Sequence, residues 1–411
     1  MSVSYHSLSS TFDRAISRRE SRWDWVNPVV MGLLALCGLL CIASAQSYFG
    51  GSQWKMQLMY FALGALCYVG VSLIDYRYYL ANAHLIYAAG IVLLLLLFTP
   101  LGETRFGARR WLDFGLLSFQ PSESAKICTL LMVASILTRS KVGNVADSLK
   151  TLLKIAGVVA LPVLLIFSQP DLGSSFVFFP LVFALLYVSD LSKRFFVTVF
   201  GVFAALVALV AVDIHGYHAF LKEKNLTAMQ ARGQYQEISW FPLRDYQRER
   251  IITFVAPEAV DPQGIGVSWN QRQSLIAVGS GGILGKGIFE GTQAKLGYLP
   301  SSVAPNDFIF SVLAEEFGLL GGLFVIGCLS ALVGNTLRIA HKARERFGML
   351  ICVGVATILM VHVFVNIGMT IGIMPVKGIP LPFLSYGGSF VLICCVLMGL
   401  VQSVYRYRKD F

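Results

Sequence analysis

Residues 28–47 read PVVMGLLALCGLLCIASAQS and contain no charged side chain. As a helix, a run of this length spans the roughly 30 Å hydrocarbon core of a bilayer. Further apolar runs lie at residues 54–74, 80–100, 121–138, 152–168, 172–189, 194–212, 307–337, 348–372 and 387–405. The sequence therefore predicts an all-α polytopic membrane protein with about ten transmembrane helices.

The composition also favours lipid as the main solvent. The 411 residues are 56% hydrophobic and only 14% charged, so polar groups are too few to cover the surface of a water-soluble globule. The eight cysteines all lie within apolar runs without metal-ligand spacing, and we interpret them as small buried hydrophobes. The first 25 residues are polar and show no cleavable signal pattern, so segment 1–27 is expected to stay attached.

Lysine and arginine collect in alternate connections, which predicts the orientation of the chain. The basic residues concerned are Arg14, Arg18, Arg19, Arg22, Arg77, Arg139, Lys141, Lys193, Arg194, Arg338, Lys342, Arg344, Arg346, Arg406, Arg408 and Lys409. Their placement predicts that both termini, including segment 1–27, are cytoplasmic. Topology and attraction to anionic membrane lipids account for most of the net charge of +10, so no nucleic acid partner is expected.

Three connections on the opposite side contain polar residues that packing in lipid does not require. The connection at 101–120 has a cationic cluster that the positive-inside rule disfavours there, and it holds Arg105, Arg109, Arg110, Trp111 and Asp113. The stretch 213–306 is uncommonly long for a loop, and 373–389 has glycines and prolines around Lys377. We therefore expect the function on the extracytoplasmic face, with 213–306 as a large loop between spans seven and eight.

The large loop contains glycine-rich turns and arginines. Its second part combines Arg244, Arg248 and Arg250 with Ser280-Gly281-Gly282 and Gly285-Lys286-Gly287. Glycines allow close backbone approach and basic side chains donate to anions, so a phosphate-bearing ligand is one interpretation. The pattern does not match a P-loop, and glycine-rich turns that bind nothing are the alternative.

Ionisable residues in or beside spans are candidates for function. Glu123 and Lys126 share a helix face behind Pro121, so they either line a cavity or form an ion pair at the start of the helix. Asp171, in the shortest outer turn, is interpreted as a turn or cap carboxylate. The apolar run at 307–337 is too long for one straight span, and its charged and glycine residues predict a break or a cavity-lining stretch; they are Glu315, Glu316, Gly318, Gly321 and Gly322.

Two further polar positions have open interpretations. His362 and Asn366 are one helical turn apart, and an inter-helix hydrogen bond is favoured over a ligand pair. Asp307 begins the eighth run after Pro305-Asn306, where a carboxylate is usually a helix cap. Partial desolvation at that depth would instead raise its pKa toward the range of a general base.

The polar segments form an ordered series over nearly the whole chain. It comprises Gly107-Ala108-Arg109-Arg110-Trp111, Gln120-Pro121-Ser122-Glu123 with Lys126, Gln169-Pro170-Asp171-Leu172-Gly173, Tyr246-Gln247-Arg248, Asp261-Pro262-Gln263-Gly264, Gln273-Ser274, Gly291-Thr292-Gln293, Asp307-Phe308-Ile309-Phe310, Ala314-Glu315-Glu316, Gly378-Ile379-Pro380-Leu381-Pro382-Phe383 and Ser385-Tyr386-Gly387-Gly388. This series resembles the SEDS family (shape, elongation, division and sporulation), and within it the RodA branch more than FtsW or SpoVE.

The resemblance implies a single membrane domain over residues 1–411 with ten spans, in the bacterial cytoplasmic membrane. It implies a peptidoglycan glycosyltransferase for cell elongation and shape, which polymerises lipid II into glycan strands and has a class B penicillin-binding protein as partner. The alternatives are a division or sporulation member, a flippase for a lipid-linked sugar, and a non-catalytic scaffold. No inverted repeat is visible, and the polar residues concentrate on one face, which favours the polymerase over the flippase.

The resemblance also implies roles for residues. The family's essential aspartate falls on Asp307, which we expect to be the general base, while Arg110, Arg248 and Lys286 are candidates to hold the diphosphate of the donor. The other expected substrate contacts are Trp111, Glu123, Lys126, Gln273, Ser274, Glu315 and Ser385. A divalent cation (Mg or Mn) that assists at the diphosphate is a separate hypothesis, and no cluster of ligands in the sequence calls for a metal.

The sequence departs from the family pattern just before the aspartate. The family usually has His-Thr there, about four residues after Leu-Pro, whereas here Leu299-Pro300 is followed by Ser-Ser-Val-Ala-Pro-Asn and then Asp307. Lys377 is typical of FtsW-like members, while Gly291-Thr292-Gln293 and Ile379-Pro380-Leu381-Pro382-Phe383 are RodA-like.

Overall fold

The computed structural model describes most of the chain. The described residues are 23–105, 108–113, 115, 118–140, 145–169, 171–189, 193–224, 226, 230–231, 233–236, 239–241, 243–257, 261, 263–266 and 268–408. Outside them lie several residues named above, namely Arg14, Arg18, Arg19, Arg22, Gly107, Lys141, Pro170, Pro262 and Lys409, together with most of segment 1–27.

A helix lies at each of the ten predicted runs. These helices are α2 (Val26–Gln46), α3 (Gln53–Leu73), α5 (Ala83–Leu96), α6 (Pro121–Arg139), α7 (Val145–Ser168), α8 (Leu172–Val188), α9 (Lys193–Lys224), α14 (Ile309–Lys342), α15 (Arg346–Thr370) and α16 (Gly388–Tyr407). Within the described part of the chain, seven are long and apolar enough to cross a membrane, while α5 and α8 are shorter apolar helices. The protein is therefore mostly helical and has several candidate membrane spans.

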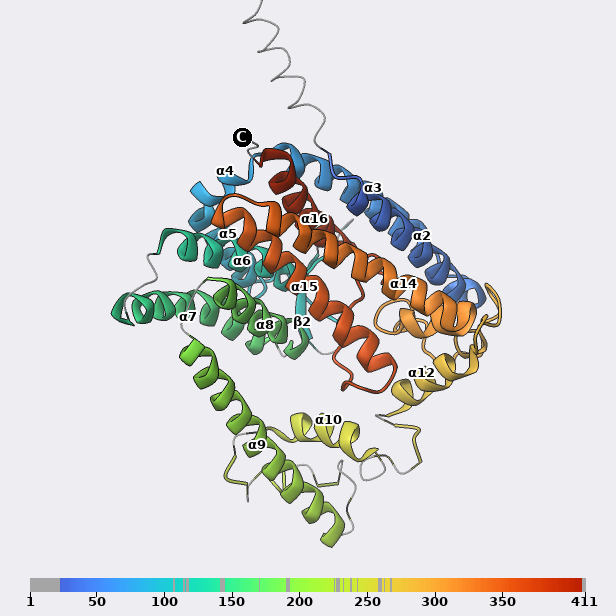
Figure 1. The fold of residues 1–411 in the computed structure, drawn as a ribbon. Helices are drawn as coiled ribbons and strands as arrows, with labels where there is room; N and C mark the ends of the chain where they lie inside the picture. The colour runs from blue at the N-terminus through green and yellow to red at the C-terminus, as the bar shows by residue number, and fades with distance from the viewer. Residues whose placement is uncertain are drawn as a thin grey trace, which may run out of the picture.

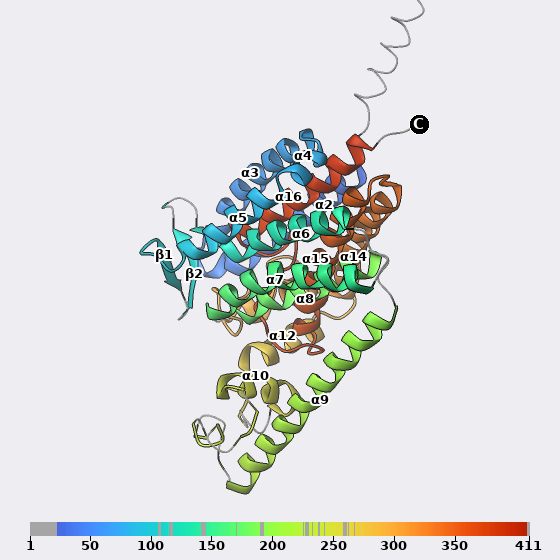
Figure 2. The same ribbon diagram turned by 90° about the vertical axis from the view of Figure 1, so that its left-hand side faces the viewer.

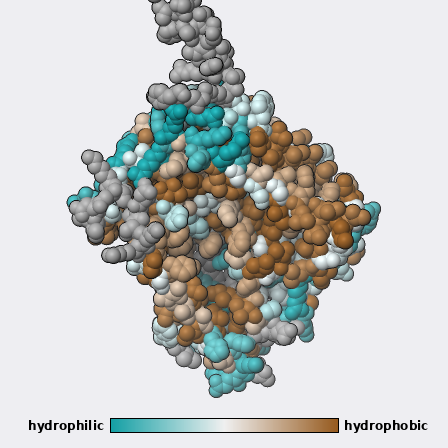
Figure 3. All heavy atoms as spheres, in the orientation of Figure 1, coloured by the Kyte–Doolittle hydropathy of each residue, from teal (hydrophilic) through white to brown (hydrophobic). Residues whose placement is uncertain are grey.

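Helices α14, α15 and α16 form the centre of the bundle, with α2, α3, α6 and α8 packed around them (Figure 1). Small residues allow the closest approaches. Gly64 of α3 lies against Cys395 of α16, and Gly399 of α16 lies against the backbone of Tyr68. Hydrophobic side chains cover most of the middle of the molecular face in Figure 3, and hydrophilic ones gather at its top and bottom, as a bilayer requires.

The connection at 101–120 folds into a small sheet, which the all-α prediction omitted. Strands β1 (Gly102–Arg105), β2 (Ala108–Asp113) and β3 (Ser118–Phe119) pair antiparallel in the order β1-β2-β3. Leu112 opposes Phe119 and is fully buried, while Arg109 on β2 is exposed. Its guanidinium donates to the carbonyls of Thr99 and Gly102 and so ties the sheet to the end of α5.

Helix α14 is broken at Gly318, which confirms the break predicted from the length of this run. Gly318 has φ 64° and ψ −162°, a conformation that is essentially restricted to glycine. A break frees backbone groups that lipid cannot satisfy. The segment at 282–287 supplies the partners. The amides of Leu319 and Leu320 donate to the carbonyls of Gly282 and Ile283. In the other direction, the amides of Lys286 and Gly287 donate to the carbonyls of residues 315 and 316.

Helix α9 continues beyond residue 212, the predicted end of the seventh run, to Lys224. Its C-terminal end packs against α10 (Asp245–Val255) through a second small core formed by Tyr217, Leu221, Ala231 and Ile252. In Figure 2, α9 and α10 lie below the bundle, at the end opposite the C-terminus. The remaining short elements are η1 (Ser47–Phe49), α4 (Tyr76–Ala81), α12 (Trp269–Ser280) and α13 (Thr292–Lys295).

Arg248 of α10 holds this second core together. Its side chain is fully buried, and its Nε and Nη1 donate to Asp213 Oδ2 at 2.8 Å and to Asp245 Oδ1 at 3.3 Å. Its Nη2 donates to the Ser239 hydroxyl and to the carbonyl of Phe241. The guanidinium is therefore committed to the interior of the loop.

We predict that Gly318→Ala destabilises the protein, whereas Gly327→Ala in the same helix does not. A Cβ at 318 would lie 2.3 Å from the amide nitrogen of Gly285, and the backbone conformation alone costs alanine about 1–3 kcal/mol. A Cβ at 327 meets no other atom of the described residues within 4 Å. Thermal melting of the purified proteins tests this, and equal midpoints for the two variants would contradict the role of the break.

We predict that Arg248→Ala lowers stability by about 3–5 kcal/mol, because it leaves the buried Asp213 without its partner. The measurement is the thermal midpoint together with the apparent affinity of the folded fraction for its substrate. If the variant has normal stability but has lost affinity for the substrate, Arg248 binds the substrate instead.

Candidate active site

Asp307 lies one residue before the N-cap of α14. The N-cap is Phe308, and no side chain caps the helix, so the interpretation of Asp307 as a cap is wrong. The amide of Asp307 donates to the carbonyl of Val303, which closes a turn that follows Pro300. This turn leaves the carboxyl group of Asp307 free of the helix end.

The carboxyl group of Asp307 is half-buried and faces Gly378. A Cβ added at Gly378, whose φ is +61°, would lie 3.4 Å from Asp307 Oδ2. Among the residues that the structure describes, neither carboxylate oxygen has a hydrogen-bond or ion-pair partner. Burial raises the pKa of Asp307 to about 6, because the charged form loses solvation. A carboxylate with this pKa can accept a proton near neutral pH.

Backbone contacts fix the turn that contains Asp307. The Ser385 hydroxyl donates to the carbonyl of Asn306 at 2.6 Å, and the amide of Tyr386 donates to the carbonyl of Pro305 at 2.8 Å. From the other side, Asn366 Nδ2 of α15 donates to the carbonyl of Asp307 at 2.9 Å. Ser385 is fully buried, so the structure uses this predicted substrate contact to hold the backbone beside Asp307.

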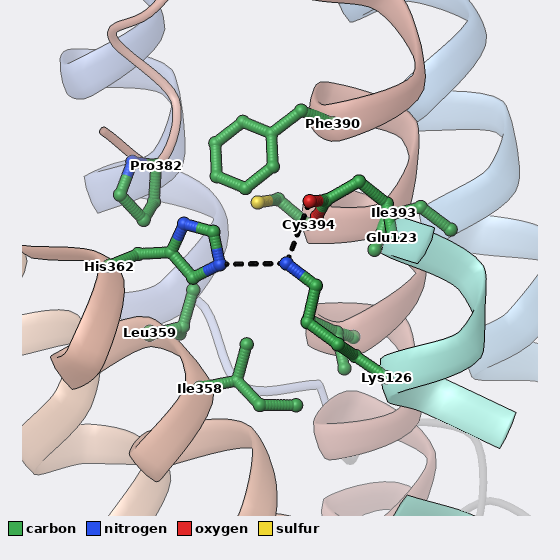
Figure 4. Close-up of a pocket in the computed structure, with 10 residues that line it drawn as sticks. Glu123, Lys126, Ile358, Leu359, His362, Pro382, Phe390, Ile393 and Cys394 are labelled. Carbon is green, nitrogen blue, oxygen red and sulfur yellow. Dashed lines mark hydrogen bonds and ion pairs between the residues drawn. The ribbon is translucent and has the colours of Figure 1, made fainter. Parts of the chain in front are cut away.

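Glu123 and Lys126 form a buried ion pair at the start of α6 (Figure 4). Lys126 Nζ donates to Glu123 Oε1 at 2.7 Å and lies 3.0 Å from His362 Nε2 of α15. Pro121 occupies the start of the helix, as the sequence predicted. The three polar side chains border a cavity of about 10 Å³, roughly the space that one water molecule needs. The ion pair at the start of the helix is confirmed, and a role of the pair in a substrate cavity stays a prediction.

The glycine-rich segment before α13 has a structural role that the phosphate interpretation did not include. Cβ atoms at Gly281 and Gly285 would lie 2.0 Å and 2.1 Å from the carbonyl oxygens of Ala314 and Glu316. Only glycine permits this approach to the broken helix. The segment thus completes α14, and nothing in its backbone geometry requires a phosphate.

Lys286 and Glu315 are paired with each other. Lys286 Nζ contacts Glu315 Oε1 at 2.6 Å and the Thr292 hydroxyl at 2.8 Å. Glu315 is fully buried and also accepts from the amides of Thr292 and Gln293. The Lys286 side chain is 26% exposed, so its ammonium retains access to solvent that Glu315 lacks.

Gln273 and Ser274 lie on the inner side of α12. The Ser274 hydroxyl is 2.6 Å from that of Ser311 on α14 and donates to the carbonyl of Thr370 on α15 at 2.8 Å. Gln273 is also buried. The structure therefore gives Ser274 an inter-helix role close to the start of α14, and Gln273 lies beside it on the same helix.

The connection at 101–120 meets the bundle at the turn before α8. Arg110 Nε donates to the carbonyl of Gln169, and Trp111 pairs with Glu103 in the sheet. Asp171 caps α8 by accepting from the amide of Ser174, which confirms the predicted cap.

Lys377 also lies at this end, and it was not among the predicted site residues. A Cβ at Gly173 would lie 2.7 Å from its carbonyl, and the next residue, Gly378, faces Asp307. The sequence signal that could have identified Lys377 is the one that identified Arg110. Each is a basic residue in a connection where the positive-inside rule predicts few basic residues. The Lys377 backbone therefore lies beside the first turn of α8, and the Arg110 side chain bonds to Gln169 just before that helix. Arg248 is bonded elsewhere, to Asp213.

Comparison with known proteins identifies the chain. The family model described as "Cell cycle protein", which covers FtsW, RodA and SpoVE, matches residues 24–410. The peptidoglycan glycosyltransferase MrdB of Escherichia coli K12 is 37% identical over 95% of this chain and 97% of its own length. The peptidoglycan glycosyltransferase RodA of Treponema pallidum is 32% identical over 94% and 98%.

Solved structures agree with this assignment. A chain from a peptidoglycan synthase complex that coordinates polymerization and crosslinking superposes with a TM-score of 0.72 at 27% identity, covering 95% of this chain and 100% of that chain. The rod shape determining protein RodA of Thermus thermophilus superposes with a TM-score of 0.64 at 25% identity, covering 95% and 99%. The chain belongs to the FtsW, RodA and SpoVE family of cell cycle proteins.

Proposed function

We propose that this protein is a peptidoglycan glycosyltransferase that polymerises lipid II into glycan strands for cell elongation and shape. The names of the relatives MrdB and RodA support the activity and the elongation role. The observation that carries the mechanism is the half-buried carboxylate of Asp307, which has no partner among the described residues and whose pKa is raised to about 6. Such a group is suited to be a general base.

In the proposed reaction a hydroxyl of the acceptor sugar attacks the anomeric carbon of the donor. A carbon–oxygen bond forms to the acceptor, and the bond between the anomeric carbon and the diphosphate breaks. The proton of the hydroxyl passes to Asp307, and undecaprenyl diphosphate departs with the bonding electron pair. The backbone contacts of residues 305–307 hold the base in place during the transfer.

Basic side chains at the same end are proposed to stabilise the departing diphosphate. Arg110 retains this role, and we add Lys377, which lies next to the glycine that faces Asp307. Lys286 is a weaker candidate because Glu315 already neutralises it. We withdraw Arg248, whose donors are used inside the loop. The substrate contacts of Trp111, Glu123, Lys126, Gln273, Ser274, Glu315 and Ser385 remain hypotheses, and the internal bonds above favour positioning for Ser274, Glu315 and Ser385.

A divalent cation, Mg²⁺ or Mn²⁺, at the diphosphate is a separate hypothesis. Within the described residues, no group of three or more His, Cys, Asp or Glu is arranged to hold a metal ion. The residues present do not form such a site by themselves, and no step of the proposed reaction passes through a metal.

We also propose ten spans, cytoplasmic termini and an outward-facing site, with a class B penicillin-binding protein as partner. The helices at all ten predicted runs and the alternation of basic connections support this topology. The similarity to a chain of a peptidoglycan synthase complex supports the partner. A cytoplasmic-membrane enzyme of this topology meets lipid II at the outer face of the bilayer.

We predict that Asp307→Asn lowers turnover of lipid II by about a hundredfold or more, because the amide cannot accept the proton. Thermal stability should not fall, since the amide caps no helix and avoids burying a charge. Polymerisation of purified lipid II, measured beside the thermal midpoint, tests both statements. A folded variant that polymerises at the parental rate would exclude Asp307 as the base.

We predict an acid limb in the turnover of the parent protein, with a midpoint near the Asp307 pKa of about 6. Only the unprotonated carboxylate acts as base, so turnover should fall about tenfold per pH unit below the midpoint and level off above it. The rate should be measured from about pH 4.5 to 8 at lipid II concentrations well below KM, where it follows kcat/KM and reports the pKa of the free enzyme, with stability checked at each pH. A rate that stays constant down to pH 4.5 would contradict the assignment.

A further inference from the structure

Helix α15 presents two polar side chains, one turn apart, to the backbone beside Asp307. We propose that His362 and Asn366 are positioning residues of the glycosyl transfer, which connect the buried Glu123–Lys126 ion pair to the segment 379–381 and to the backbone of Asp307. This inference rests on the proposed role of Asp307. It goes beyond that role, because it states how a pair on α6 acts on a base at the start of α14.

The contacts of His362 determine its tautomer. Its Nδ1 lies 3.1 Å from the carbonyl oxygen of Pro380, and a carbonyl only accepts, so Nδ1 must carry the hydrogen. In the neutral ring Nε2 is then the acceptor, and it faces the Nζ of Lys126 at 3.0 Å. A second ring proton would point at an ammonium group. The imidazole is therefore neutral. Its Nε2 accepts a hydrogen bond from Lys126, and its Nδ1 donates one to the carbonyl of Pro380, which makes the ring a bridge between the two.

The ion pair at the start of this bridge is fixed. The side chains of Glu123 and Lys126 are 5% and 2% exposed, and both come from the first two turns of α6. A buried ammonium cannot leave its partners without a large desolvation cost. Figure 4 shows Lys126 between Glu123 and His362, with Phe390 stacked near the imidazole and Pro382 beside it. These contacts fix the position of the imidazole, and its Nδ1 then fixes the position of the Pro380 carbonyl.

Asn366 extends the network to the base. Its Nδ2 donates to the carbonyls of Ile379 at 2.7 Å and of Asp307 at 2.9 Å. One amide group therefore sets the separation of the 379–381 segment from the turn that holds Asp307. Gly378, which faces the Asp307 carboxyl group, immediately precedes the bonded residues. A shift of this segment would change the surroundings of the carboxylate directly.

Neither residue is placed to contact substrate. His362 and Asn366 are 2% and 0% exposed, and the hydrogen bonds of both His362 ring nitrogens and of Asn366 Nδ2 end on protein atoms. Their effect on the base therefore passes through the Asp307 turn or the segment beside it. Loss of position of a base lowers the rate of the chemical step, while binding energy from distant parts of the substrate is retained.

Two substitutions at His362 separate the two halves of the bridge. His362→Asn places an amide where Nδ1 lies and keeps a donor for Pro380, but it removes the acceptor for Lys126. His362→Gln reaches the position of Nε2 and keeps that acceptor, but it loses the donor to Pro380. Because the bridge needs both halves, we expect each variant to lower kcat for lipid II polymerisation at least tenfold with KM changed less than threefold.

Asn366→Ala should give the same split between kcat and KM. Its matched control is Asn335→Ala, at the other end of α14 from Asp307. This substitution also removes two buried hydrogen bonds of an asparagine amide, those to Asp24 and Asn27. We expect the control to keep kcat. The double variant His362→Gln with Asn366→Ala should lose less than the product of the two single losses, since both act on one segment.

The assay uses the full-length chain in vesicles with purified lipid II, with rates corrected for the folded fraction from thermal melting. Normal kcat in the His362 and Asn366 variants, or losses matched by Asn335→Ala, would overturn the positioning role. A rise in KM alone would do so as well. Asp307→Asn is run alongside: if it polymerises normally the proposed base fails, whereas an inactive Asp307→Asn with normal His362 and Asn366 variants overturns only this inference.

Discussion

The absence of water inside the bilayer is the constraint on which the rest of the structure depends. Each backbone amide or carbonyl that leaves a helix there needs a protein partner. The break at Gly318 obeys this rule, because residues 282–287 bond to both sides of it. The turn before α14 obeys it too, through Ser385, Tyr386 and Asn366. At both places a second segment satisfies the irregular backbone that a catalytic site needs.

Buried charge follows the same logic. Lys126 is paired with Glu123, Arg248 with Asp213, and Lys286 with Glu315. Such pairs add little net stability, but removing one partner is costly, so each pair fixes the relative position of its two segments. The Ser44 hydroxyl of α2 likewise donates to Glu316 of α14. Asp307 differs from these groups, since among the described residues its carboxylate has no such partner.

The sequence predicted what depends on local pattern. Apolar length located the ten helices, the glycines in an overlong run located the break at Gly318, and turn chemistry identified the cap at Asp171. It could not predict contacts between distant segments. The sequence around Arg248 does not distinguish a phosphate from Asp213 as the partner of its guanidinium. The bond from Lys126 to His362 joins residues that are 236 positions apart. The sheet at 102–119 was missed because its strands are short and lie between helices.

The unpaired state of Asp307 and the rigidity around it are two parts of one requirement. A base with a strong partner would have a lowered pKa and little affinity for a proton, so the carboxylate must remain without a cation. An unpartnered side chain has no contact to hold it in place, and the structure compensates through the backbone, which is bonded on both sides of the residue. The residue is thus held through the carbonyl groups of Asn306 and Asp307, and no bond in this support is made to the carboxylate itself.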